Sequence, residues 1–158
     1  MTMLVRKYRP GEEAELWQLF FDTVHFVNLG DYDAAQVRAW APEVIDEEGW
    51  RLRIERNQPY VCECDDRIVG FADVQSTGYI DQFFVHHAWQ GRGIGKRLFA
   101  AIETEARQRQ VPELSSNVSI TARPFFESRG FQVVSSQIVR VGEVELTNFK
   151  MVKALVSN

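Results

Sequence analysis

The sequence predicts an α/β domain in which helices flank a mixed, largely antiparallel sheet. Segments that alternate like strands are interleaved with segments of helical periodicity along the whole chain. The chain has 158 residues, of which 45% are hydrophobic and 25% charged, as in one ordinary soluble domain. Because no repeat or linker divides the sequence, residues 1–158 are expected to form a single domain.

The first third of the chain reads as one strand followed by three helices. Leu4 to Arg9 alternates like a short edge strand and ends at a Pro-Gly pair. Glu12 to Val27 has a broad apolar face at helical spacing and acids in its first turn. Two shorter helices are predicted at Ala34 to Trp40, with Asp33 as the N-cap, and at Glu47 to Arg56.

The pattern then changes to strands. Tyr60 to Cys64 and Ile68 to Gln75 flank a short acidic turn, which predicts a hairpin, and Tyr79 to Val85 is expected to add a third strand. Cys62 and Cys64 are the two cysteines of the chain. With no second pair of ligands they do not predict a zinc site, so no metal is expected.

The last third alternates again. Lys96 to Arg109 is an amphipathic helix and Leu114 to Val118 a strand. Ala122 to Arg129 is a short helix for which Thr121 is the expected N-cap and Gly130 the stop. The chain closes with a predicted hairpin, Phe131 to Val141 and Val144 to Val152.

Charge and hydropathy exclude some classes of partner. The net charge of −4 argues against a general nucleic-acid binder, which needs a basic face. No apolar run is long enough to span a bilayer, and the N-terminus lacks the pattern of a signal peptide. The sequence therefore predicts a cytoplasmic protein that binds neither nucleic acid nor membrane.

A glycine-rich loop between a strand and a helix is the main candidate for a ligand site. Glycines at 91, 93 and 95 let the backbone adopt positive φ and approach a ligand closely. The N-terminus of the following helix offers unpaired N–H groups and a partial positive charge, which suits a phosphate. Three basic residues add to that charge: Arg92, Lys96 and Arg97.

Two well-known phosphate loops do not fit this segment. The Walker loop would need Gly at Gln90 and Ser or Thr at Arg97. The dinucleotide fingerprint would need Gly or Ala at Lys96. A tight strand-to-helix turn with solvated basic residues is the alternative interpretation.

Two separate motifs resemble one known family. The run Gln90-Gly91-Arg92-Gly93-Ile94-Gly95 matches the Gln/Arg-x-x-Gly-x-Gly/Ala signature of the GCN5-related N-acetyltransferases (GNAT), and Ala122 to Phe131 resembles their Ala-x-x-Phe-Tyr-Glu-x-x-Gly-Phe block. The resemblance covers essentially the whole chain and suggests a small bacterial branch. It implies the GNAT fold and transfer of acetyl from acetyl-CoA to a small-molecule or protein amine, by direct attack in a ternary complex.

The resemblance also implies roles for single residues. The amide of Phe83 would polarise the thioester carbonyl, Val85 would hold the pantetheine arm, and the glycine loop would wrap the pyrophosphate. The residues expected to bind the cofactor are Phe83, Phe84, Val85, Gln90, Gly91, Arg92, Gly93, Ile94, Gly95, Lys96 and Phe126.

The sequence departs from the family pattern near the reacting centre. Phe126 stands where the family has a tyrosine that can act as the general acid, and Ser119 stands where it has an asparagine. Phenylalanine cannot donate a proton, so water is left to protonate the coenzyme A thiolate. The departure also keeps open a different class of protein, a coenzyme A-binding sensor without catalysis. An acyltransferase with a longer acyl donor is another alternative.

Three residues are candidates for handling the amine. Tyr79 falls where the family has a carboxylate, which leaves Asp81 as the nearest acid to orient or deprotonate the amine, or merely to form a structural pair. In an uninterrupted strand, Asp81 and Phe83 would share one face. His25, at the end of the first helix, is a candidate base, with simple burial as the alternative.

The sequence says less about the walls of the acceptor pocket and about the oligomeric state. The aromatic residues Tyr32 and Trp40, with Phe26 and Trp89, are candidates for an acceptor pocket or for the core. The C-terminal hairpin often mediates dimers in the family, so the resemblance also suggests a homodimer.

Overall fold

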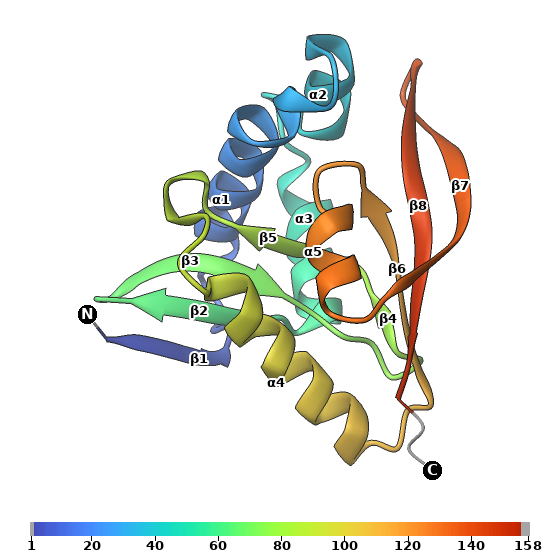
Figure 1. Cartoon of the computed structure of the whole chain (residues 1–158). Helices are drawn as coiled ribbons and strands as arrows, with labels where there is room; N and C mark the ends of the chain where they lie inside the picture. Colours follow the sequence, from blue (N-terminus) through green and yellow to red (C-terminus); the bar gives the residue numbers. More distant parts are fainter. Residues whose placement is uncertain (1, 156–158) are drawn as a thin grey trace.

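The computed structural model describes residues 2–155 (Figure 1). Its strands are β1 (Met3–Lys7), β2 (Tyr60–Cys64), β3 (Arg67–Ala72), β4 (Tyr79–Ile80), β5 (Phe83–Val85), β6 (Glu113–Ser119), β7 (Gln132–Val141) and β8 (Val144–Ala154). Its α-helices are α1 (Glu13–Phe26), α2 (Ala34–Trp40), α3 (Glu47–Asn57), α4 (Ile94–Gln108) and α5 (Arg123–Ser128), and two short 3₁₀ turns are η1 (Asn28–Gly30) and η2 (His87–Trp89). The order of strands and helices is the predicted one, except that the single strand predicted at Tyr79 to Val85 is two strands, β4 and β5. Within residues 2–155, no helix combines the length and the apolar character needed to cross a bilayer.

The strands form two four-stranded sheets. Their orders are β1-β2-β3-β5 and β4-β6-β8-β7, and the pairing is antiparallel except between β4 and β6. Figure 1 shows α4 on one side of the first sheet and α1 and α3 on the other. The predicted class, a mixed and largely antiparallel arrangement flanked by helices, is confirmed. Its division into two sheets was not predicted.

Residues of β3 contribute to the core on both faces of the first sheet, and a register shift opposite Cys62 and Glu63 inserts one extra residue, so that the alternation is not regular. Ile68 and Phe71 pack in an apolar cluster with α1, whereas Val69 and Ala72 pack in a second cluster with α4. Between them, Gly70 lets α4 lie close to the sheet. A Cβ atom there would come within 2.9 Å of the Ile94 side chain. This close packing places the start of α4 beside the end of β5.

The predicted strand Tyr79 to Val85 is wrong at its centre, because it is interrupted by Asp81 and Gln82. The backbone amides of these two residues donate to the Asp73 carboxylate at 2.9 and 2.8 Å. Asp73 is fully buried and therefore needs such donors. The residues before the interruption join the second sheet and those after it join the first, and the strand predicted to run to Gln75 ends at Ala72.

The ends of the helices follow the predicted signals with one exception. The Asp33 carboxylate accepts the amide of Gln36 at 2.8 Å and caps α2, as expected. Gly130 follows α5 with φ +96°, which only glycine adopts readily. The prediction that Thr121 caps α5 is wrong. The N-cap residue is Ala122, no side chain caps the helix, and the Ser119 hydroxyl accepts the amide of Ala122 at 3.0 Å.

Candidate active site

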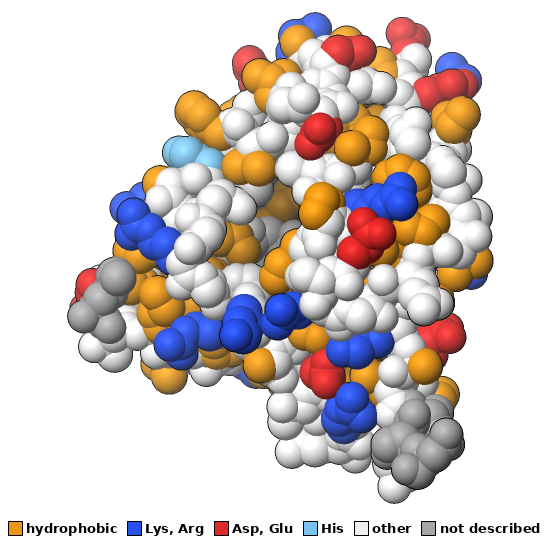
Figure 2. Space-filling model, viewed as in Figure 1, with side chains coloured by type: hydrophobic (Ala, Val, Ile, Leu, Met, Phe, Trp, Pro, Cys, Tyr) orange, Lys and Arg blue, Asp and Glu red, His pale blue; other side chains and the backbone are white. Residues whose placement is uncertain are grey.

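Two cavities meet where the two sheets separate. The loop cavity, of about 260 Å³, is lined by the end of β5, the glycine loop and the start of α5. Figure 2 shows a hollow between the segment after β5 and α5, with Lys and Arg side chains gathered below it over the start of α4. The aromatic cavity, of about 210 Å³, lies on the other side of Phe83 and is walled by α2, α3 and the β7–β8 hairpin.

The backbone of the glycine loop forms one wall of the loop cavity. Gly91 and Gly93 have φ of +72° and +82°, and α4 starts directly after them at Ile94. Gly95 faces the ring of Phe125, which a Cβ atom would approach to 3.2 Å. Unpaired amides at the start of α4 thus border the cavity, and such amides with the helix dipole form an anion site.

The three basic residues near the loop have different positions. Lys96 lines the loop cavity. Arg92 instead stacks on the ring of Trp89 at 4.8 Å, and Arg97 is exposed on α4 outside the cavity lining. Of the predicted basic cluster, Lys96 is therefore the residue placed to meet an anion in the loop.

The free edge of β5 forms the opposite wall. The amide of His86 donates to Val69 and the carbonyl of Gln82 accepts from Asp73, so both point toward β3. Because strand residues alternate, the amides of Phe83 and Val85 point the other way, into the loop cavity. The carbonyl of Val85, however, already accepts the Thr23 hydroxyl at 3.1 Å and the Gln90 side-chain amide at 2.7 Å.

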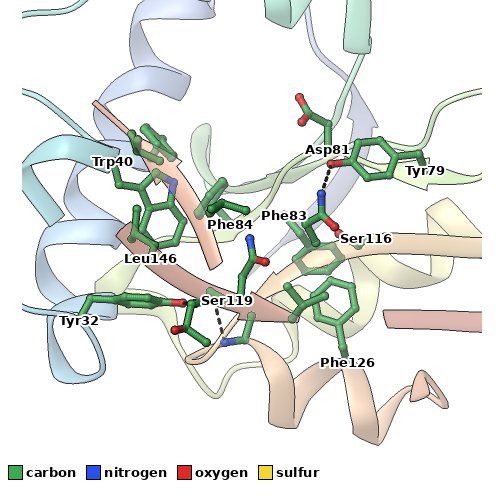
Figure 3. A pocket seen from close by; sticks show the side chains of 18 of the residues that line it. Tyr32, Trp40, Tyr79, Asp81, Phe83, Phe84, Ser116, Ser119, Phe126 and Leu146 are labelled. Carbon is green, nitrogen blue, oxygen red and sulfur yellow. Dashed lines mark hydrogen bonds between the residues drawn. The ribbon is translucent and has the colours of Figure 1, made fainter. Parts of the chain in front are cut away.

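The aromatic cavity is formed largely by apolar side chains. The rings of Tyr32 and Phe84 lie 5.6 and 6.4 Å from the ring of Trp40. Figure 3 shows these rings and Leu146 on one side of the cavity, with Tyr79 and Asp81 on the other. The Tyr32 hydroxyl donates to the carbonyl of Thr147 at 2.6 Å and accepts the amide of Ile120 at 2.9 Å, so it has no free proton to offer.

Asp81 sits at the edge of the aromatic cavity in an ion pair. Its carboxylate accepts Nε and Nη2 of Arg53 at 2.8 and 3.1 Å, and Nδ2 of Asn57 at 2.7 Å. Burial alone would raise the pKa of Asp81, but the hydrogen bonds and charge of Arg53, with the bond from Asn57, outweigh it and lower that pKa. Asp81 is therefore ionised at neutral pH and is a weak base.

Tyr79 lies beside Asp81 with its hydroxyl at the same edge. The hydroxyl accepts Nδ2 of Asn117 at 3.3 Å, which leaves its own proton free to be donated. Burial, with the negative charge of Asp81, raises the pKa of Tyr79, so the phenol stays protonated at neutral pH.

His25 lies outside both cavities. One ring nitrogen is 2.8 Å from the carbonyl of Ala41, and the ring stacks on Phe21 at 4.0 Å. These contacts join α1 to the end of α2. They match the packing alternative for His25 and place no reacting group beside it.

Ser119 and Phe126 border both cavities at their junction. Phe126 is buried and packs on Phe83, with ring centres 5.5 Å apart, so the family tyrosine position points to the junction but carries no hydroxyl. The Ser119 hydroxyl accepts the amide of Ala122, and its proton remains available. Ser119 thus places a hydroxyl at the junction of both cavities, where Phe126 has none.

A buried polar cluster supports Asp81 from behind. Besides the two backbone amides, the Asp73 carboxylate accepts the side-chain amide of Gln75 at 2.9 Å and lies 3.4 Å from Nδ2 of Asn57. Burial raises the pKa of Asp73 to about 6, against the effect of these donors. Asn57 bridges Asp73 and Asp81, so the position of one carboxylate fixes the other.

With this geometry established, comparison with known proteins identifies the family. Residues 28–153 match the family described as "Acetyltransferase (GNAT) domain". The chain belongs to the GNAT family of acetyltransferases. This confirms the resemblance drawn from the two motifs, and the chain is therefore an acyltransferase.

Relatives of this GNAT chain cover nearly its whole length. The uncharacterized N-acetyltransferase YafP of Escherichia coli (strain K12) is 34% identical over 148 residues, 93% of each chain. A GCN5-related N-acetyltransferase from Rhodopseudomonas palustris superposes with a TM-score of 0.93 at 28% identity, covering 98% of this chain and 97% of that one. PaiA N-acetyltransferase from Thermoplasma acidophilum, in complex with coenzyme A, shares the fold with a TM-score of 0.79 at 17% identity, over 98% and 99% of the two chains.

The sequence predicted most of the residues that line the loop cavity of this GNAT chain. It did not predict the residues that support Asp81 in the aromatic cavity. Arg53, Asn57 and Asp73 were not singled out. Asp73 carried a signal, because it is an acid at the end of the apolar run from Ile68 to Val74. Arg53 carried none, since its pairing with Asp81 depends on how α3 docks.

Proposed function

We propose that this chain transfers the acetyl group of acetyl-CoA to an amine that attacks the thioester directly. The observation that carries this proposal is the junction of the two cavities at Phe83, Ser119 and Phe126. A thioester held in the loop cavity and an amine held in the aromatic cavity would meet there in one complex. PaiA, which has the same fold, was solved in complex with coenzyme A, and this supports coenzyme A as the ligand.

The donor would be held mainly by backbone groups. The pyrophosphate would bind the amides of the glycine loop and the start of α4, with Lys96 as the cationic side chain. The amide of Val85 would bind the pantetheine arm, and the amide of Phe83 would polarise the thioester carbonyl. A pantetheine bond to the carbonyl of Val85 requires the exposed side chain of Gln90 to turn away.

The chemistry needs two protons removed from the acceptor and one supplied to the leaving group. The bound ammonium group first gives a proton to water, and the free amine nitrogen then attacks the thioester carbon and gives its second proton to water. The C–S bond breaks to release the coenzyme A thiolate, which water protonates. Asp81 orients the acceptor rather than deprotonating it, because the lowered pKa of the Asp81 carboxyl makes it a weak base. The Ser119 hydroxyl can donate a hydrogen bond to the thiolate at the junction.

The first experiment is thermal melting with and without acetyl-CoA. Binding at about 100 times Kd should stabilise the protein by about 2.7 kcal/mol, which raises the Tm of a domain of this size by about 5–10 °C. Lys96→Glu should remove most of this rise. Arg97→Glu, the same charge change on the adjacent residue outside the cavity, should keep it.

The outcomes separate the proposal from its rivals. No rise in Tm at saturating acetyl-CoA contradicts donor binding altogether. A rise without thiol release over a panel of amines supports the silent sensor instead. Faster thiol release with longer acyl thioesters than with acetyl-CoA would identify a different donor.

A further inference from the structure

The aromatic cavity contains one acid and one base, and they neutralise each other. Among its lining residues in the described part of the chain, Arg53 and Asp81 are the charged ones, and they form the ion pair already described. The other nearby carboxylate, Asp73, is fully buried, and its oxygens already accept backbone and side-chain donors. The cavity therefore offers a single anionic group to a cation.

Asp81 has room for one more donor. Its Oδ2 accepts two hydrogen bonds, from Arg53 and Asn57, whereas Oδ1 accepts one, from Arg53. A carboxylate offers about four lone-pair sites, so Oδ1 can accept one ammonium group. A second ammonium group of the same molecule would meet the guanidinium of Arg53 instead.

Several other polar groups of the lining are paired within the protein. The Ser116 hydroxyl donates to the carbonyl of Ile80 at 2.8 Å, and the side-chain oxygens of Asn117 and Asn148 each accept Nε2 of Gln137 at 3.0 Å. The hydroxyl of Tyr32 is engaged as well, whereas the hydroxyls of Tyr79 and Ser119 each keep a proton that can be donated to a ligand.

The volume of the cavity is sufficient for one ring. An apolar cavity of about 150 Å³ can hold benzene, so about 210 Å³ has room for a ring with a short amine arm. Trp40, Phe84 and Phe20 present their rings to it, and the lining also includes Val139, Val141 and Leu146.

We propose that the acceptor is a small monoamine with an aromatic or bulky apolar body, bound with its ammonium group at Asp81 and its body among these rings. The inference rests on the proposed acetyl transfer and names its substrate class. Polyamines and aminoglycosides, which carry several cations, would leave all but one of them without a carboxylate.

The experiment compares four acceptors by thiol release. These are 2-phenylethylamine, ethanolamine as a monoamine without a ring, spermidine as a polyamine, and tobramycin as an aminoglycoside. Burying a ring is worth about one to two factors of ten in binding, so kcat/KM for 2-phenylethylamine should exceed that for ethanolamine by about 10- to 100-fold. It should exceed the values for spermidine and tobramycin by at least about tenfold.

A pair of variants tests whether the cavity causes this preference. Val139→Glu places a second carboxylate in the wall of the cavity, and Ile138→Glu places it on the adjacent, 71% exposed residue of β7. Val139→Glu should lower kcat/KM for 2-phenylethylamine and raise it for spermidine. Ile138→Glu should leave both values as in the wild type.

The melting experiment with acetyl-CoA, run on the same samples, separates two kinds of failure. A protein that acetyl-CoA does not stabilise contradicts the proposed function, and the inference falls with it. If acetyl-CoA binds but none of the four acceptors releases thiol, the proposed transfer itself is contradicted. If transfer occurs, a preference for spermidine or tobramycin, or no transfer to 2-phenylethylamine, overturns the inference and leaves the proposed function intact.

Discussion

The loop cavity and the aromatic cavity are built from different parts of the chain. Backbone amides, the glycine conformations and a helix N-terminus form the loop cavity. Side chains form the aromatic cavity, and its one ion pair depends on a buried polar cluster behind it. The donor end is therefore insensitive to most side-chain changes, whereas each wall residue of the acceptor end can change which amine fits.

The largest effect is expected from Asp73→Ala, which removes the centre of the polar cluster. The buried amides of Asp81 and Gln82 would lose their acceptor, at about 1–3 kcal/mol each, so unfolding free energy should fall by about 2–6 kcal/mol. Urea denaturation measures this, with the exposed Asp31→Ala as the control.

Should Asp73→Ala fail to fold, Asp73→Asn keeps one acceptor oxygen and should lose less stability. Unfolding free energies equal to the wild type in both variants would show that the cluster does not hold the interruption between β4 and β5.

Gly93→Val tests the dependence of the loop cavity on backbone conformation. A β-branched residue at φ +82° is strained by about 1–3 kcal/mol and should distort the loop, weakening acetyl-CoA binding by about tenfold or more. Gly142→Val, at φ +60° in the β7–β8 turn, is the matched control. Titration calorimetry should show the loss in the first variant only, and equal losses would argue against the loop as the donor site.

Asp81→Asn distinguishes orientation of the amine from proton removal. Loss of a charged hydrogen bond to the ammonium group should raise KM for the acceptor by about tenfold, while kcat changes less. Steady-state kinetics with Glu48→Gln, on the exposed side of α3, as the control would measure this. A collapse of kcat at unchanged KM would instead make Asp81 the base.

The smallest effect is expected from Phe126→Tyr, which restores the family hydroxyl at the junction. A general acid that limits the rate is worth about 10²-fold or more. Because a thiolate is a good leaving group, we expect kcat to change by less than about tenfold, measured by single-turnover acetyl transfer. A larger gain would mean that protonation of the thiolate limits the natural enzyme.

The same division explains what the sequence could predict. The loop Gln90 to Gly95 was recognisable because glycine at a positive φ and a helix start are local properties. Three other local signals were predicted in the same way. They are Asp33 at the N-cap of α2, Gly130 at the end of α5 and Gly142 in the turn of the final hairpin.

The parts that were not predicted depend on contacts between distant segments. The strand predicted at Tyr79 to Val85 is interrupted because the amide of Asp81 donates to the carboxylate of Asp73, which follows the end of β3. Arg53 reaches Asp81 across 28 positions in sequence. The N-cap of α5 was misplaced by one residue, because the helix starts after Ala122, which has no side chain that can cap it, and the Ser119 hydroxyl accepts the amide of Ala122 across the turn.

The open edge of β5 has a consequence for solubility. An unpaired strand edge invites pairing with the edge of another molecule and so favours aggregation. Here β5 has three residues, and its free amides, those of Phe83 and Val85, face a cavity closed on its other side by α5. Such a recess admits a slender ligand chain but not a second sheet, so the fold can keep an edge available without exposing it to its neighbours.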